Sequence, residues 1–156
     1  GARLIINLEK LYLSLKKLEL KNSKIDEYYK LSHELGIPQK DMNKLQNKLF
    51  GIECNFEQLN GIDFQKGCYV GQENTARIKL KDKLTKRLLP IKTINGNINK
   101  DEVIFHENVD IGKILIAGEH PFALIKITGK NFDFDSIYNT NSATVKIIKP
   151  NWLNLS

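Results

Sequence analysis

A cysteine flanked by glycines and preceded by a lysine is the feature of this sequence best suited to chemistry. It lies in residues 66–73, which read KGCYVGQE, with the Lys66 ammonium two positions before the Cys68 thiol. A nearby positive charge favours the thiolate, the form that acts as nucleophile or metal ligand. Gly67 and Gly71 let the backbone turn sharply and approach a ligand. Cys68 and Lys66 are therefore catalytic candidates, although spacing alone supports a structural loop equally well.

The neighbours of Cys68 add polar and aromatic groups that suit a flat, nitrogen-containing ligand. Gln72 and Glu73 offer an amide and a carboxylate that could bind ring nitrogens of a heterocycle, or could begin a following helix. Tyr69 could stack on such a ring or anchor the loop in a core. Residue types do not separate these alternatives.

The other cysteine and the three histidines predict no metal site within this chain. Cys54 lies fourteen positions before Cys68, without a CxxC pair and without a basic neighbour, so we expect an inert, partly buried thiol. His33, His106 and His120 share no segment and no metal-ligand spacing, which favours surface histidines. Two cysteines in a lysine-rich chain also favour free thiols over a disulfide.

The segment before this run has one clear helix signal. Residues 23–35 begin with Ser23 and Asp26, which resemble a capping box, and Gly36 and Pro38 stop the pattern. Residues 8–18 fit a helix or a strand equally well by periodicity. Residues 39–49 are polar and predict a loop or a short helix.

After Glu73 the pattern changes to alternation and turn signals, which are typical of antiparallel sheet. A small β-barrel or sandwich should follow a mixed α/β first part, so the fold class is α+β, with a boundary near residues 84–90. We place a first domain at 1–86 and a barrel domain at 87–156. The candidate strands are residues 75–80, 86–93, 102–105, 112–117, 122–127 and 144–148, and Trp152 should pack the last segment onto the barrel.

Charge and hydropathy exclude some classes of partner. The net charge is +6, but it comes from 21 Lys and only 3 Arg spread over every segment, whereas nucleic-acid readers depend on Arg and on clusters. The densest group, residues 79–87, alternates with leucines and favours a solvated strand face over a nucleic-acid groove. No run of apolar residues is long enough for a membrane span, and the start lacks a secretory signal. We expect no membrane partner and a cytoplasmic chain.

The run KGCYVGQE resembles the signature of the YgfZ-type family, which serves iron–sulfur cluster assembly or repair. Its flanks resemble the family as well: Glu53 and Asn55, the LNGI of residues 59–62, and Phe64. The similarity continues in Arg77, in residues 86–88 (KRL) and in residues 109–114 (VDIGKI). Residues 28–38 give a weaker match.

The resemblance implies the C-terminal half of a folate-binding fold related to the glycine cleavage T-protein, closed by a small barrel. It implies tetrahydrofolate as cofactor, with Tyr69, Gln72, Glu73, Glu53 and Arg77 as cofactor-binding candidates. It also implies iron–sulfur assembly proteins or client enzymes as partners, and the mitochondrial matrix as the location if the source is eukaryotic.

Two departures from the family weaken the folate expectation. Its members are about twice as long, and the chain starts with Gly rather than Met, so we expect a piece of a longer protein that binds folate weakly or not at all. Ser32 also stands where the family often has Arg.

Two other functions stay open. One is an aminomethyltransferase that moves a one-carbon unit to tetrahydrofolate, although the Cys68 signature favours an assembly factor over this enzyme. The other is a barrel that docks RNA or a partner protein through its basic face.

Overall fold

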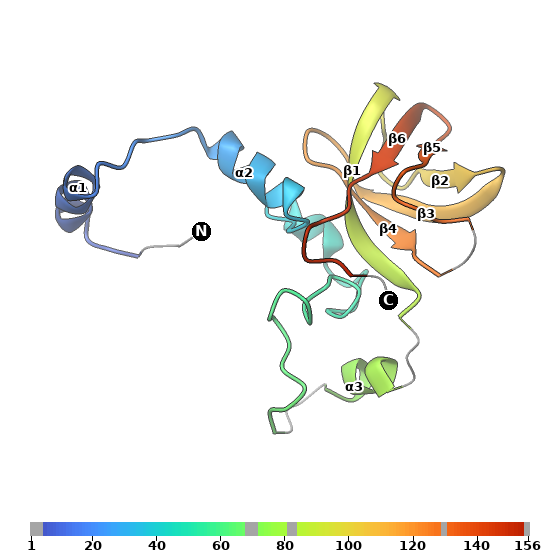
Figure 1. Ribbon diagram of the computed structural model, residues 1–156, viewed down its shortest axis with the longest axis horizontal. Coiled ribbons are helices and arrows are strands. Elements are labelled where there is room, and N and C mark those ends of the chain that lie inside the picture. Colours follow the sequence, from blue (N-terminus) through green and yellow to red (C-terminus); the bar gives the residue numbers. More distant parts are fainter. Residues whose placement is uncertain (1–4, 68–71, 81–83, 129–130, 155–156) are drawn as a thin grey trace.

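The computed structural model describes residues 5–67, 72–80, 84–128 and 131–154 and confirms an α+β fold with a small barrel (Figure 1). Among these residues the helices come first and the strands follow. The helical elements are α1 (Leu8–Lys17), α2 (Ile25–Glu34), the 3-10 helix η1 (Met42–Leu45) and α3 (Gln72–Leu80). The strands are β1 (Lys86–Gly96), β2 (Val103–His106), β3 (Val109–Ile116), β4 (Phe122–Lys126), β5 (Ile137–Asn139) and β6 (Ala143–Ile147).

The six strands form a closed antiparallel barrel in the order β1-β4-β3-β2-β5-β6. Strand β1 closes it because its first half pairs with β4 and its second half pairs with β6. Inward side chains fill the interior with branched aliphatic residues and Tyr138, all 5% exposed or less. The expected barrel is therefore confirmed, including five of its six strands.

Helix α2 confirms the helix expected over residues 23–35, but its start differs from the expected capping box. Lys24 is the N-cap and makes no side-chain capping bond, while the Ser23 hydroxyl donates to Glu27 Oε2 at 2.7 Å. The end is as expected. Gly36 has φ +71°, and the amides of residues 36 and 37 donate to the carbonyls of His33 and Ser32, which is the Schellman pattern.

Helix α2 packs on the barrel through a buried histidine, which corrects the expectation of surface histidines. His33 is 8% exposed, its Nε2 lies 2.9 Å from the Pro121 carbonyl oxygen, and its ring meets Phe122 edge-on with centroids 5.1 Å apart. Burial lowers the pKa of His33, because the charged form loses its hydration. The ring of His120 lies 5.7 Å from that of His33, so two histidines from distant segments meet.

The C-terminal segment holds the end of α2 against the barrel, which agrees with the expectation that Trp152 packs this segment onto the barrel. Trp152 Nε1 donates to the Leu35 carbonyl oxygen at 2.7 Å, and its ring packs against the barrel core. Leu153 is 1% exposed within the same core. The last segment is thus part of the barrel's hydrophobic structure.

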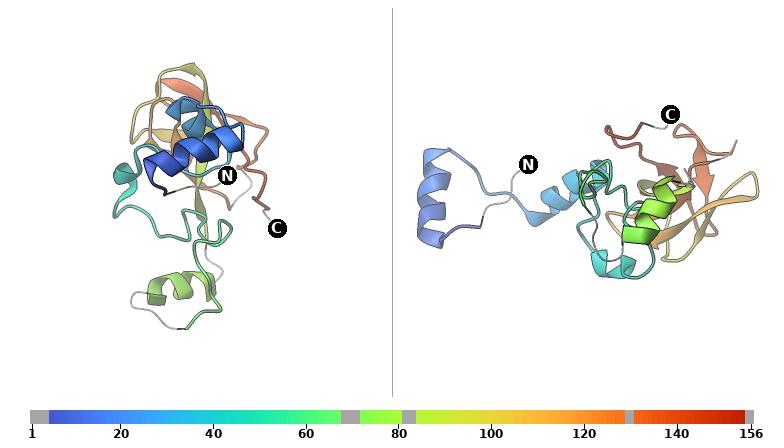
Figure 2. Two further views of the ribbon diagram at one scale, coloured as in Figure 1. Left: turned by 90° about the vertical axis from the view of Figure 1, so that its left-hand side faces the viewer. Right: turned by 90° about the horizontal axis from the view of Figure 1, so that it is seen from below.

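Helix α1 lies apart from the barrel in Figures 1 and 2 and buries none of its residues. The ambiguous pattern of residues 8–18 resolves as helix. Asn7 caps it by accepting from the Glu9 amide at 2.9 Å, and Lys16 and Lys17 in the last turn favour the negative end of its dipole. Among the described residues, no helix has the length and apolar character needed to cross a bilayer.

The strand expected at residues 75–80 is wrong, because these residues belong to helix α3. Glu73 in the first turn and Arg77 and Lys79 in the last turn have the charges that the helix dipole favours. The alternation of lysine and leucine suggested a strand and did not reveal this charge pattern. The solvated strand face expected for residues 79–87 is also wrong at Arg87, which is 8% exposed.

A second apolar cluster joins the segment before α3 to the outside of the barrel. Leu88, Leu115, Ile116 and Phe122 form it on the barrel, and they pack against partly buried residues that include Leu45, Leu49 and Cys54. The helical part and the barrel therefore share apolar packing. The division into domains 1–86 and 87–156 stays a prediction.

Candidate functional site

The central residues of the KGCYVGQE run, Cys68 and Tyr69, lie outside the described residues. Lys66 lies just before them and is exposed, and α3 begins just after them at Gln72. Glu73 and Arg77 lie on α3 with exposed side chains. The helix-start alternative for Gln72 and Glu73 agrees with this position.

Gly67 leaves open space on the N-terminal side of the cysteine. Among the described residues, nothing lies within 4 Å of a Cβ built on it, and its φ is not positive. A glycine at this position therefore leaves room for another group to approach the backbone closely, and it does not serve a left-handed turn.

Lys66 lines a hollow of about 450 Å³ beside the motif. The wall contains an aromatic ring, a methyl-rich side chain, amides and carboxylates, so it offers both stacking and hydrogen-bonding groups. Of the described candidates, Glu53, Glu73 and Arg77 are not among the residues that form the wall. The wall is made by Glu57, Asn60, Ile62, Asp63, Phe64, Gln65 and Lys66.

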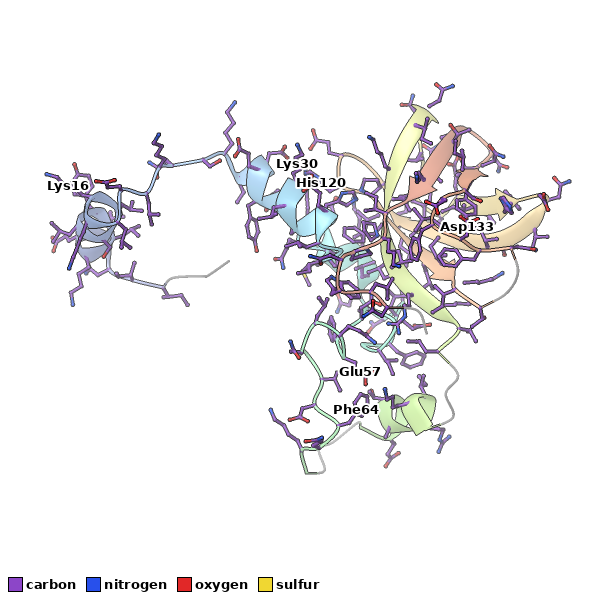
Figure 3. All side chains as sticks on the ribbon, in the orientation of Figure 1. Lys16, Lys30, Glu57, Phe64, His120 and Asp133 are labelled. Carbon is purple, nitrogen blue, oxygen red and sulfur yellow. The ribbon has the colours of Figure 1, made fainter. Side chains whose placement is uncertain are left out.

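Lys79 ties helix α3 to this hollow. Its ammonium donates to Glu57 Oε1 and lies 5.6 Å from the centre of the Phe64 ring. Figure 3 shows Glu57 and Phe64 side by side next to α3. Because the ammonium satisfies the carboxylate and faces the ring, Lys79 holds α3 against the wall that Lys66 also lines.

A buried polar network fixes the base of this region to the first barrel strand. The Asn55 amide donates to the Leu88 carbonyl oxygen at 2.8 Å, and its Oδ1 accepts from Arg87 at 2.9 Å. The same Arg87 nitrogen donates to Gln58 Oε1 at 3.1 Å, while Arg87 Nε has no partner among the described residues. Burial lowers the pKa of Arg87. This network ties residues 55–58 to the start of β1.

Glu53 has a local structural role in this network. Its Oε2 accepts from the Phe50 amide at 3.0 Å, and its carbonyl oxygen accepts from the Leu88 amide at 2.8 Å. It therefore closes the turn that carries Asn55. Its assignment as a cofactor-binding residue stays a prediction with no support from this geometry.

Cys54 is the inert thiol that its surroundings predict. It is half-buried against the second apolar cluster, and burial, with a smaller contribution from Glu53, raises the pKa of the thiol to about 11. At neutral pH it is therefore protonated and a poor nucleophile.

Residue types alone missed the roles of Glu57 and Lys79. They are 22 positions apart, and no periodicity links them. Phe64, Asn55 and Arg87 belong to the stretches that carry the family resemblance, which was the one available signal for them. The wall places aromatic, amide, carboxylate and ammonium groups around one hollow, an arrangement that suits a flat polar molecule.

Sequence comparisons supply the relationship that this geometry leaves open. No family model matches the chain. A mitochondrial iron–sulfur cluster assembly factor IBA57 homologue of Dictyostelium discoideum is 38% identical over 94 residues, which are 58% of this chain and 22% of that protein. The Neurospora crassa homologue is 46% identical over 56 residues, which are 36% of this chain and 13% of that protein. The chain is related to the IBA57 iron–sulfur assembly factors.

A mammalian relative agrees with this assignment. The mitochondrial iron–sulfur cluster assembly factor IBA57 of Mus musculus is 37% identical over 68 residues, which are 44% of this chain and 19% of that protein. The resemblance to a family of iron–sulfur assembly factors is therefore confirmed. The matched part covers only 13 to 22% of the length of these three relatives.

Proposed function

We propose that this chain contributes to iron–sulfur cluster assembly or repair, with the Cys68 thiol as its working group and Lys66 as the residue that favours the thiolate. The observation that carries the proposal is the KGCYVGQE run in a chain related to iron–sulfur assembly factors. The exposed positions of Lys66 and Gly67, directly before Cys68, support the proposal. The partners are then iron–sulfur assembly proteins or client enzymes, and the relatives' names favour a mitochondrial location over a cytoplasmic one.

Cys68→Ser in the full-length protein should abolish rescue of iron–sulfur enzyme activity in cells that lack the factor. The reason is that a hydroxyl is neither an effective nucleophile nor a soft metal ligand at neutral pH. The measurement is the activity of an iron–sulfur enzyme in cell extract, at matched levels of the expressed protein.

Cys54→Ser is the matched control, because it removes a thiol whose pKa is raised to about 11. Its rescue should stay close to that of the unchanged protein. Full rescue by a normally folded Cys68→Ser protein would remove the thiol from the mechanism and leave only a packing role for it.

We further propose tetrahydrofolate as a ligand of the region around residues 66–77, with Tyr69, Gln72, Glu73 and Arg77 as contact candidates. Calorimetric titration of tetrahydrofolate into this chain should give weak or undetectable binding. Any longer form that carries the upstream half implied by the family resemblance should bind more tightly. Equal affinity of the two forms would place a complete pocket within these 156 residues and would contradict the need for an upstream half.

A further inference from the structure

Helix α2 and the loop between β3 and β4 bring together three side chains that suit a metal ion. They are Asp26 in the first turn of α2, and Glu119 and His120 in the loop. One donor atom from each lies within 4.8 Å of the others. Figure 3 shows His120 on the barrel beside α2. The two segments are 94 positions apart at His120 and Asp26, so sequence spacing could not reveal the group.

The imidazole of His120 is held in place before any ion arrives. Its side chain is 10% exposed and packs beside the rings of Tyr29 and His33, with centroids 6.2 and 5.7 Å away. Its Nε2 points at Asp26 Oδ1, 3.1 Å away. A fixed imidazole nitrogen directed at a carboxylate loses little rotamer freedom when a metal binds between them.

The two carboxylates are accessible and able to adjust. The side chains of Asp26 and Glu119 are 60% and 71% exposed, and both line a hollow of about 680 Å³ with room for water ligands. Lys40 donates to Glu119 at 2.9 Å and competes with a cation. That pair is solvent-exposed, so breaking it costs little.

We propose that Asp26, Glu119 and His120 bind a divalent transition-metal ion, with zinc as the best fit. One imidazole and two carboxylates are typical zinc ligands, and water would complete the coordination. Zinc bonds of about 2.0 to 2.1 Å place ligand atoms about 3.3 Å apart, which exposed carboxylates can reach by rotating. The ion would tie α2 to the barrel. The site uses no residue of the Cys68 region, so it stands apart from the proposed function.

The test is titration of the purified chain with Zn²⁺ and with Co²⁺, followed by calorimetry and by cobalt absorption. All proteins carry Cys54→Ser and Cys68→Ser, so that thiols do not bind the added ion. We expect one ion per chain and a higher melting temperature with the ion present. Asp26→Asn and Glu119→Gln should each weaken metal binding at least about tenfold. Loss of a residue that only hydrogen-bonds to a metal ligand already lowers metal affinity about 10- to 100-fold, and these two carboxylates are proposed to bind the ion directly.

The matched control is Asp110→Asn, since Asp110 is also an exposed carboxylate paired with a lysine, 3.1 Å from Lys126. It should leave metal affinity unchanged. The carboxylate variants are preferred over His120→Ala, because His120→Ala would also remove ring packing. Cooperative thermal unfolding of the carboxylate variants without metal shows that they are folded. Absence of saturable binding, or binding that Asp26→Asn and Glu119→Gln both leave unchanged, would overturn the site.

Discussion

Asn55→Ala should lower the free energy of unfolding by about 3 kcal/mol, because it leaves a buried guanidinium short of a partner. Asn55 is 1% exposed, accepts from Arg87 and donates to the Leu88 carbonyl oxygen. Alanine removes both bonds. It also has to adopt the left-handed backbone of this position, where φ is +62° and asparagine is well tolerated. Urea unfolding of the variant and the unchanged chain measures the difference.

Gln58→Ala is the matched control for this network. Gln58 accepts from the same Arg87 nitrogen at 3.1 Å, but it is only half-buried, so water can replace the lost bond. We expect a loss of about 1 kcal/mol. If Asn55→Ala costs no more than Gln58→Ala, Arg87 regains solvent or another partner easily, and the network does not fix residues 55–58 to β1.

The barrel could be predicted from the sequence because its information is local. The longer strands β1, β3 and β4 are runs rich in leucine and isoleucine. Turn residues separate the strands, such as Asn108, which has φ +66° and lies between β2 and β3. Strand β5 was missed since it has three residues, and Tyr138 is the one buried side chain among them. Three residues are too few for a periodic signal.

Helix α3 shows where local information fails. Residues 75–80 alternate weakly, and the contacts that hold the helix come from elsewhere, through Lys79 to Glu57 and to Phe64. No pattern within nine residues encodes a partner 22 positions away.

The two candidate sites also differ in how far the sequence alone could predict them. The chemistry proposed for Lys66 and Cys68 comes from the sequence, because both lie in one short run, and it stays a prediction. The cluster of Asp26, Glu119 and His120, and the burial of His33 beside it, depend on how α2 meets the barrel. The histidines were therefore misread as surface residues, because their neighbours in space are not their neighbours in sequence.

Gly112→Ala should destabilise the chain by about 3 kcal/mol, because the added methyl group has no space between β3 and β4. A Cβ there would lie 2.5 Å from the Leu124 carbonyl oxygen and 3.1 Å from the Ile125 Cα, and both atoms belong to the backbone of the paired strand. Backbone atoms cannot turn aside as a side chain does, so the strands must separate and weaken a barrel that depends on closure. Gly67→Ala is the matched control, since no atom of the described part of the chain lies within 4 Å of a Cβ built there. The unfolding free energy of this variant should change by less than about 0.5 kcal/mol. Urea midpoints measure both, and equal midpoints for the two variants would show that β3 and β4 can move apart at little cost.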